Sequence, residues 1–135
     1  MKKIVLVGGC FDILHFGHIH FLREAKKLGD YLIVALESDE NLKKLKGQGR
    51  PIHNQDQRSQ ILKSLNFVDE VLDLPPMKSD SDYEKMVIEI SPHIIAITEG
   101  SKTKTHADKV GAKVIEVPKI KVSSTSQIAK LIGLE

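Results

Sequence analysis

Gly8-Gly9-Cys10-Phe11-Asp12-Ile13-Leu14-His15-Phe16-Gly17-His18 is the stretch around which this sequence is organised. Residues 2–7 before it form a short run rich in valine, isoleucine and leucine, which predicts a buried parallel strand. Residues 19–28 after it carry apolar side chains at helical spacing, so the stretch joins a strand to a helix. Two consecutive glycines let the backbone approach a ligand closely, and N–H groups at a helix start face the same point. We therefore expect an anion to bind here.

Two histidines sharpen this expectation. His15 and His18 are separated by three positions with Gly17 between them, so both imidazoles can lie on one side of the helix start and reach one phosphate chain. They could instead be ordinary polar residues that contact backbone carbonyls. A zinc pair is a further alternative, but Cys10 and Asp12 make a poor set of additional ligands, because Cys10 lies where the backbone must turn. We favour phosphate binding and predict no metal site.

This stretch resembles the signature of a known family. Gly9-Cys10-Phe11-Asp12 is similar to G-x-F-D, and His15-Phe16-Gly17-His18 is similar to H-x-G-H. Together they are the signature of the cytidylyltransferase-like nucleotidyltransferases, and the resemblance covers nearly the whole chain. It implies a Rossmann-like fold, catalytic roles for the two histidines, and nucleotide binding by the residues of the first loop: Gly9, Cys10, Phe11, Asp12 and Gly17.

Length and composition narrow the class of protein. A chain of 135 residues has the size of one domain, and the resemblance implies that residues 1–135 form a single nucleotidyltransferase domain. A net charge of +2 and an aromatic content of 4% do not favour a nucleic-acid partner. One cysteine fits a reducing compartment, and no apolar run approaches the length of a membrane span. We predict a cytoplasmic protein that binds neither nucleic acid nor membrane.

Apolar runs alternate with helical patterns, which predicts an α/β fold: a Rossmann-like three-layer sandwich with a five-stranded parallel sheet and helices on both faces. The predicted strands are 2–7, 31–36, about 70–72, 93–98 and 113–117. The predicted helices are 19–28 with Gly29 as its cap, a short helix capped by Ser38 or Asp39 with its far end at 43–47, and then 56–65, 83–90, 104–110 and 126–132. An irregular connection is predicted over 75–82. Ligands bind such sheets at the carboxyl ends of the strands. A dinucleotide-binding oxidoreductase is disfavoured because G-x-G-x-x-G is absent.

Lys46 and Arg58 are further candidates for phosphate contact. Leu45-Lys46-Gly47 and Arg50-Pro51 resemble heptose-phosphate adenylyltransferases, in which a lysine here reaches the phosphates. Arg58 is similar to the arginine of the family's E-x-R motif, and a guanidinium offers a rigid fork to phosphate oxygens. A surface ion pair is the alternative for Arg58. The resemblance implies catalytic roles for both residues.

The later segments carry more of the resemblance and also depart from it. Ser124 and Thr125 align with a Ser-Thr pair that holds nucleotide phosphates in the family, and Gly100 aligns with a glycine after the fourth strand. Residues 119–122 replace the R-T-E-G of glycerol-phosphate cytidylyltransferases, and the acid expected after Gly100 is missing. These departures count against glycerol phosphate as the acceptor and leave the base open.

The predicted reaction is transfer of a nucleoside monophosphate from CTP or ATP to a phosphorylated small molecule, with release of pyrophosphate and with Mg²⁺ on the triphosphate. We favour CTP because the overall size resembles that of the single-domain glycerol-phosphate cytidylyltransferases. The segment around Lys46 resembles the heptose-phosphate enzymes, so an adenylyltransferase of the heptose-phosphate or FMN type that uses ATP is the alternative. A non-catalytic nucleotide-binding relative is the competing class. The resemblance also implies a homodimer.

Overall fold

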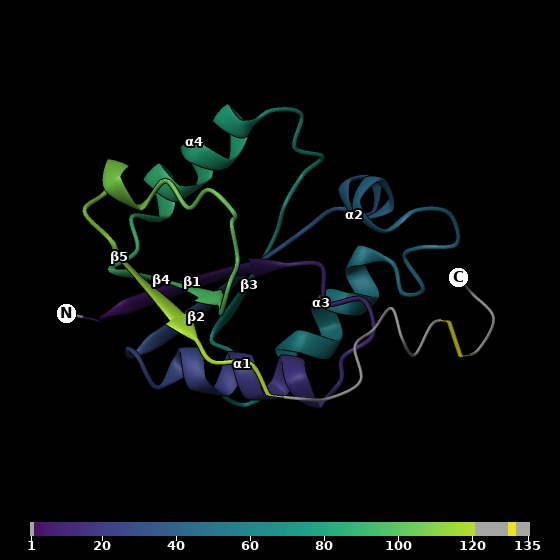
Figure 1. The fold of residues 1–135 in the computed structure, drawn as a ribbon, viewed down its shortest axis with the longest axis horizontal. Coiled ribbons are helices and arrows are strands. Elements are labelled where there is room, and N and C mark those ends of the chain that lie inside the picture. Colours follow the sequence, from purple (N-terminus) through teal and green to yellow (C-terminus); the bar gives the residue numbers. More distant parts are fainter. Residues whose placement is uncertain (1, 121–129, 132–135) are drawn as a thin grey trace.

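The computed structural model describes residues 2–120 and 130–131 (Figure 1). Its sheet is wholly parallel, with the strand order β3-β2-β1-β4-β5. The strands are β1 (Ile4–Gly9), β2 (Tyr31–Leu36), β3 (Glu70–Asp73), β4 (Ile94–Thr98) and β5 (Lys113–Val117). The helices are α1 (Phe16–Lys26), α2 (Asp39–Lys46), α3 (Gln55–Lys63), α4 (Asp80–Ile90) and the 3₁₀ helix η1 (Ala107–Lys109).

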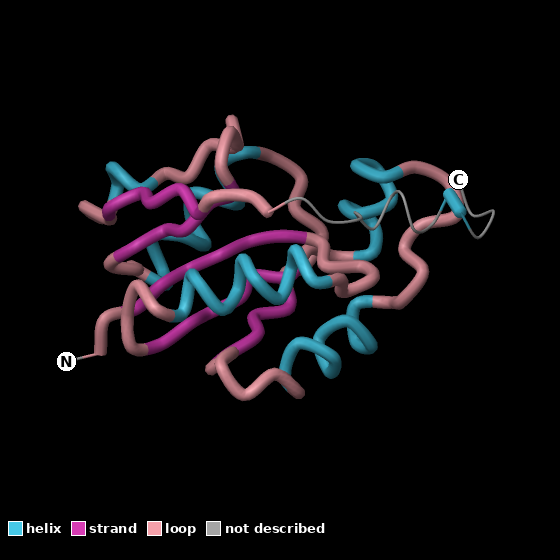
Figure 2. The backbone as a smooth tube through the Cα atoms, turned by 60° about the horizontal axis from the view of Figure 1, so that its bottom comes forward, coloured by secondary structure: helices cyan, strands magenta, loops and turns pink. Residues whose placement is uncertain are grey.

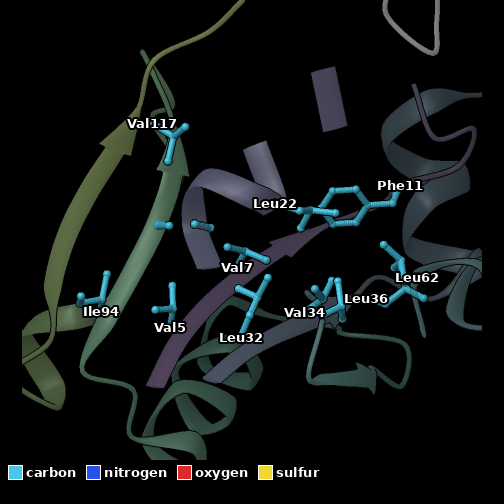
Figure 3. Packing of buried hydrophobic residues seen from close by; sticks show 13 residues of the cluster. Val5, Val7, Phe11, Leu22, Leu32, Val34, Leu36, Leu62, Ile94 and Val117 are labelled. Atoms are coloured by element: carbon cyan, nitrogen blue, oxygen red, sulfur yellow. The ribbon is translucent and has the colours of Figure 1, made fainter. Parts of the chain in front are cut away.

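The alternation of side chains along the central strand divides the core between the two faces of the sheet. Val5 and Val7 of β1 belong to the cluster that packs against Leu22 of α1, as Figure 3 shows. Leu6 lies between them in sequence and packs in a second cluster with Val87 of α4. Figures 1 and 2 show the resulting layers, with α1 and α3 on one face and α4 on the other. The predicted three-layer α/β sandwich is confirmed.

The strand order places a crevice at the carboxyl edge of the sheet. The chain runs outward from β1 through β2 to β3, and then returns across the sheet to form β4 on the other side of β1. Loops that follow β1 and β4 therefore diverge in opposite directions, which leaves space for a ligand between them. We accordingly expect the site near Gly9 and Thr98.

Several element boundaries differ from the prediction. Helix α1 begins at Phe16 rather than at residue 19, because His15 caps it and Gly17 and His18 of the motif lie in its first turn. Helix α4 begins at Asp80, so its first turn replaces the end of the predicted irregular connection. The predicted helix 104–110 is reduced to η1. Of the predicted helix 126–132, Lys130 and Leu131 are helical, and the remaining positions lie outside the described residues. None of the described helices is long and apolar enough to cross a membrane.

Gly29 lies in close contact with the backbone of Lys3, and the prediction that it caps the first helix is wrong. Helix α1 ends at Lys26, and Lys27 occupies the C-cap in a right-handed conformation. A Cβ atom on Gly29 would lie 2.6 Å from the carbonyl oxygen of Lys3 and 2.8 Å from Cγ2 of Val5. Any side chain here would push the end of α1 away from β1.

We predict that Gly29→Ala lowers the free energy of unfolding by about 2 kcal/mol, because the methyl group forces the backbone at Lys3 to move. Urea unfolding followed by circular dichroism measures this. Gly8→Ala is the matched control, since its Cβ would lie 3.8 Å from the carbonyl oxygen of Ala35, an ordinary contact. Equal stability of the two variants would contradict the prediction.

Candidate active site

A cavity of about 560 Å³ lies at the carboxyl edge of the sheet, between the ends of β1 and β4. It is formed by the loop after β1, the first turns of α1, the end of α2 and the segment after β5. The lining residues are Gly8, Gly9, Cys10, Phe11, Asp12, His15, Gly17, His18, His20, Phe21, Lys46, Arg50, Thr98, Val117, Pro118, Lys119 and Ile120. The cavity thus brings together most of the residues that the sequence predicts to bind or transfer the nucleotide.

The two motif histidines cap helix α1 and stack on each other. The Nδ1 atom of His15 accepts a hydrogen bond from the backbone N–H of Gly17 at 3.0 Å, and Nδ1 of His18 accepts from the backbone N–H of His15 at 3.3 Å. The ring centroids lie 3.9 Å apart at an interplanar angle of 27°. This reciprocal arrangement is a capping box in which histidines replace the usual hydroxyl and carboxamide side chains.

The capping bonds determine where each imidazole carries its proton. Because Nδ1 accepts a hydrogen bond in both rings, the proton of the neutral imidazole lies on Nε2. Burial lowers the pKa of His15. Burial also lowers the pKa of His18 to about 4, with help from the neighbouring charges of His15 and Lys46 and against a hydrogen bond with the Ile13 backbone. Both rings are therefore neutral N–H donors at pH 7 in the free protein.

The loop between β1 and α1 has a tightly specified shape. Phe11 adopts a left-handed conformation with φ of 46°, which is strained for an aromatic residue, and its ring is buried. That ring meets His18 edge to face, with 5.3 Å between centroids. A Cβ atom on Gly9 would lie 2.8 Å from the same ring, so the glycine gives Phe11 the room to support His18.

Asp12 anchors a second loop beneath the cavity. Its buried carboxylate accepts hydrogen bonds from Nε of Arg50 at 2.6 Å and from the backbone N–H groups of Ile52 and His53 at 2.9 and 3.0 Å. Burial alone would raise the pKa of Asp12, but these donors outweigh it and the pKa is lowered. Asp12 lines the cavity, and its carboxylate is engaged in holding the loop that contains Arg50.

Arg58 is fully buried and does not line the cavity. Its guanidinium donates to the carbonyl oxygens of Cys10 (2.8 Å), Glu37 (3.0 Å) and His53 (3.0 Å), and to Oδ1 of Asp39 (2.7 Å). This geometry does not support the predicted contact between Arg58 and phosphate. Arg58 instead positions the loops that follow β1 and β2.

The side chains around the cavity favour an anionic ligand. Lys46, in the last turn of α2, is exposed and lines the cavity. Lys119 and the buried Arg50 add positive charge that the sequence reasoning did not assign to the site. Among the described lining residues, Asp12 is the one carboxylate, and it is paired with Arg50. The Arg50-Pro51 pattern was the available signal for Arg50.

The remaining predicted residues fall outside this cavity. Gly100 turns the chain after β4 with φ of 80° and donates its N–H to Oε1 of Glu116 at 3.3 Å. Ser124 and Thr125 lie outside the described residues. Within residues 2–120 and 130–131, no group of three or more His, Cys, Asp or Glu side chains is placed to hold a metal ion.

A family model described as cytidylyltransferase-like matches residues 6–130. The chain belongs to the cytidylyltransferase-like family. It is 49% identical over 94 residues to the bifunctional protein HldE of Aliarcobacter butzleri (strain RM4018), which covers 70% of this chain and 19% of that protein. It is 38% identical over 138 residues to the bifunctional protein HldE of Vibrio atlanticus (strain LGP32), and this match covers 97% of this chain and 28% of that protein. The chain spans less than a third of the length of these relatives.

A solved structure supports the same assignment. The lipopolysaccharide core biosynthesis protein from Thermoplasma volcanium GSS1 matches with a TM-score of 0.71 and 32% identity, over 91% of this chain and 100% of that chain. The cytidylyltransferase-like fold is therefore shared over almost the full described chain. The family match confirms the resemblance inferred from the two motifs and the nucleotidyltransferase class.

We predict that Arg58→Lys lowers the free energy of unfolding by about 3 kcal/mol, because an ammonium group cannot replace a fork that reaches four acceptors. Chemical denaturation measures the loss. Arg23→Lys makes the same change at an exposed position of α1 and should alter stability by less than about 0.5 kcal/mol. Unchanged stability of Arg58→Lys with weakened nucleotide binding would instead support direct phosphate contact.

We also predict a dependence of stability on pH that arises from His18. Between pH 6.5 and about 4 the unfolded chain binds a proton on His18 that the folded chain does not, so the free energy of unfolding falls as the pH decreases through this window. His18→Gln keeps a capping-box side chain without the titration and should reduce this slope. Thermal unfolding at a series of pH values compares the two proteins, and identical slopes would rule out the effect.

Proposed function

We propose that this domain transfers a nucleoside monophosphate from a nucleoside triphosphate to the phosphate group of a small acceptor, with release of pyrophosphate. The observation that carries the proposal is the basic cavity at the start of α1, where two neutral imidazoles with Nε2–H donors lie beside Lys46 and Arg50. Such a site combines a helix N-terminus with side-chain donors, which suits a chain of phosphates.

The proposed chemistry is an in-line displacement. An oxygen of the acceptor phosphate attacks the α-phosphorus of the triphosphate, and the bond to the bridging oxygen of the β-phosphate breaks to release pyrophosphate. His15 and His18 donate hydrogen bonds to phosphate oxygens whose charge grows in the transition state, while Lys46 stabilises the leaving pyrophosphate. No protein nucleophile takes part. Burial raises the pKa of the Cys10 thiol, with a further contribution from Glu37, so this group is protonated at pH 7.

Mg²⁺ is proposed to enter bound to the triphosphate, because this ion keeps several waters and is usually held by substrate phosphates together with one or two carboxylates. When bound, the ion would neutralise phosphate charge. The chain's own contribution is to hold the phosphates between α1 and Lys46.

We propose ATP as the donor, which reverses the preference for CTP drawn from size. The support comes from the HldE relatives, which share 38% and 49% identity with this chain, and from the resemblance of the Lys46 and Arg50 segments to heptose-phosphate adenylyltransferases. A sugar phosphate is accordingly the proposed acceptor class. A homodimer in the cytoplasm remains our proposal from the family resemblance and the single cysteine.

The test is pyrophosphate release by the purified protein with Mg²⁺, using ATP and CTP separately against phosphorylated sugars, polyols and amino alcohols. We expect release with ATP and a sugar phosphate. His18→Ala should reduce turnover by about 10²–10³-fold, since it removes one preorganised donor. Arg23→Ala, which shortens an exposed side chain of α1 that does not line the cavity, is the control and should lose much less. Near-normal turnover of His18→Ala would contradict the mechanism, and nucleotide binding without release would indicate a non-catalytic relative.

A further inference from the structure

A second cavity of about 300 Å³ lies between the sheet and α4. Apolar side chains form much of its wall, including Met86 and Val87 of α4 and Ile95 and Ile97 of β4. The proposed reaction gives this cavity no role, because the phosphate-binding groups all line the first cavity. Its size and largely apolar wall suit a small organic molecule.

The two cavities meet at the ends of β1 and β4. Gly8, Gly9, Cys10, Phe21 and Thr98 line both of them. The two glycines place no side chain on this shared wall, and a Cβ on Gly8 would find no atom closer than 3.8 Å. A molecule with its phosphate in the first cavity can therefore extend its remaining atoms into the second.

A carboxylate and a phenol mark the second cavity. Glu37, directly after β2, is half-buried, and the hydroxyl of Tyr83 donates to its two carboxylate oxygens at 3.0 and 2.9 Å. Tyr83 belongs to α4, so the pair connects the helix to the sheet edge across the cavity. One hydroxyl proton leaves most of the acceptor capacity of a carboxylate unused, since its two oxygens offer about four lone-pair sites.

The charge of the second cavity differs from that of the first. Glu37 is the one carboxylate among its described lining residues, and Lys104 and His106 line it on the loop that precedes η1. Burial raises the pKa of Glu37, while the Tyr83 hydroxyl and Arg58 act to lower it. A partly desolvated carboxylate of this kind is stabilised by ligand groups that donate hydrogen bonds.

We propose that the second cavity binds the non-phosphate part of the acceptor and that Glu37, oriented by Tyr83, accepts hydrogen bonds from its hydroxyl groups. The inference rests on the proposed function and specifies the acceptor as a polyhydroxylated phosphate. Apolar side chains contact the C–H faces of a sugar, and two carboxylate oxygens can receive two neighbouring hydroxyls. An acceptor phosphate in the first cavity then lies beside the α-phosphorus, with its carbon skeleton beyond the glycine wall.

Glu37→Gln and Tyr83→Phe test this proposal in the intact chain. With ATP saturating and a sugar phosphate varied, we expect the KM for the sugar phosphate to rise about tenfold or more in Glu37→Gln, which loses a charge-assisted hydrogen bond. Tyr83→Phe should raise it about fivefold, since it frees Glu37 to turn away. The affinity for ATP, measured by calorimetry without acceptor, should not change in either variant. Glu89→Gln on the exposed part of α4 is the matched control.

Each outcome separates this inference from the proposed function. An unchanged KM for sugar phosphates in Glu37→Gln, or an equal loss of ATP affinity, would overturn the role of Glu37. Preference of the wild type for phosphocholine or phosphoethanolamine over sugar phosphates would overturn hydroxyl recognition. Absence of pyrophosphate release from the wild type with every acceptor would instead remove the proposed function. In that case calorimetric binding of ribose 5-phosphate, weakened by Glu37→Gln, supports the cavity assignment, and its absence overturns it.

Discussion

The buried guanidinium of Arg58 joins the segments on which the site depends. A parallel sheet leaves the loops at its carboxyl edge without ladder hydrogen bonds, and these loops must be fixed before they can position a ligand. Arg58 binds the carbonyl oxygens of Cys10 and Glu37, which follow β1 and β2, and that of His53, which precedes α3. Asp12 ties the same region to the Arg50 segment. Two buried charged groups therefore hold the floor of the cavity.

Much of the fold could be predicted because its signals are local. The five strands are short apolar runs, and their order follows the alternation with helices. The starts of α1 and α4 could not be placed, since their first turns are polar or carry motif residues. Phe16 is 61% exposed, so it adds nothing to the apolar face that marks the rest of α1. Capping residues determine where these two helices begin, and the spacing of apolar residues carries no information about capping residues.

The site was predictable where a motif is contiguous and unpredictable where chain segments meet. Residues 8–18 lie on one loop and helix start, so their position follows from the sequence alone. The role of Arg58 depends on acceptors that are 48 and 21 residues away in the sequence. The residue type reveals that the side chain is charged, but it does not reveal which groups the side chain contacts. Glu37 and Tyr83 are separated by 46 positions and share no pattern in the sequence. Only the return of the chain from β3 across the sheet brings them together.

The motif histidines combine a structural and a chemical constraint. As caps they must present Nδ1 to the backbone, which leaves the proton on Nε2 and keeps each ring neutral. A neutral donor does not attract an anion as strongly as an imidazolium does, so in the proposed reaction the affinity for phosphates would come from Lys46 and Arg50 together with the helix N-terminus. In the proposed reaction, charge that develops on the phosphoryl oxygens would strengthen the hydrogen bonds from Nε2, while Nδ1 of each ring stays engaged with the backbone. The strained Phe11 and the glycine beside it are consistent with this demand, because a rigid loop keeps the donors where that charge appears.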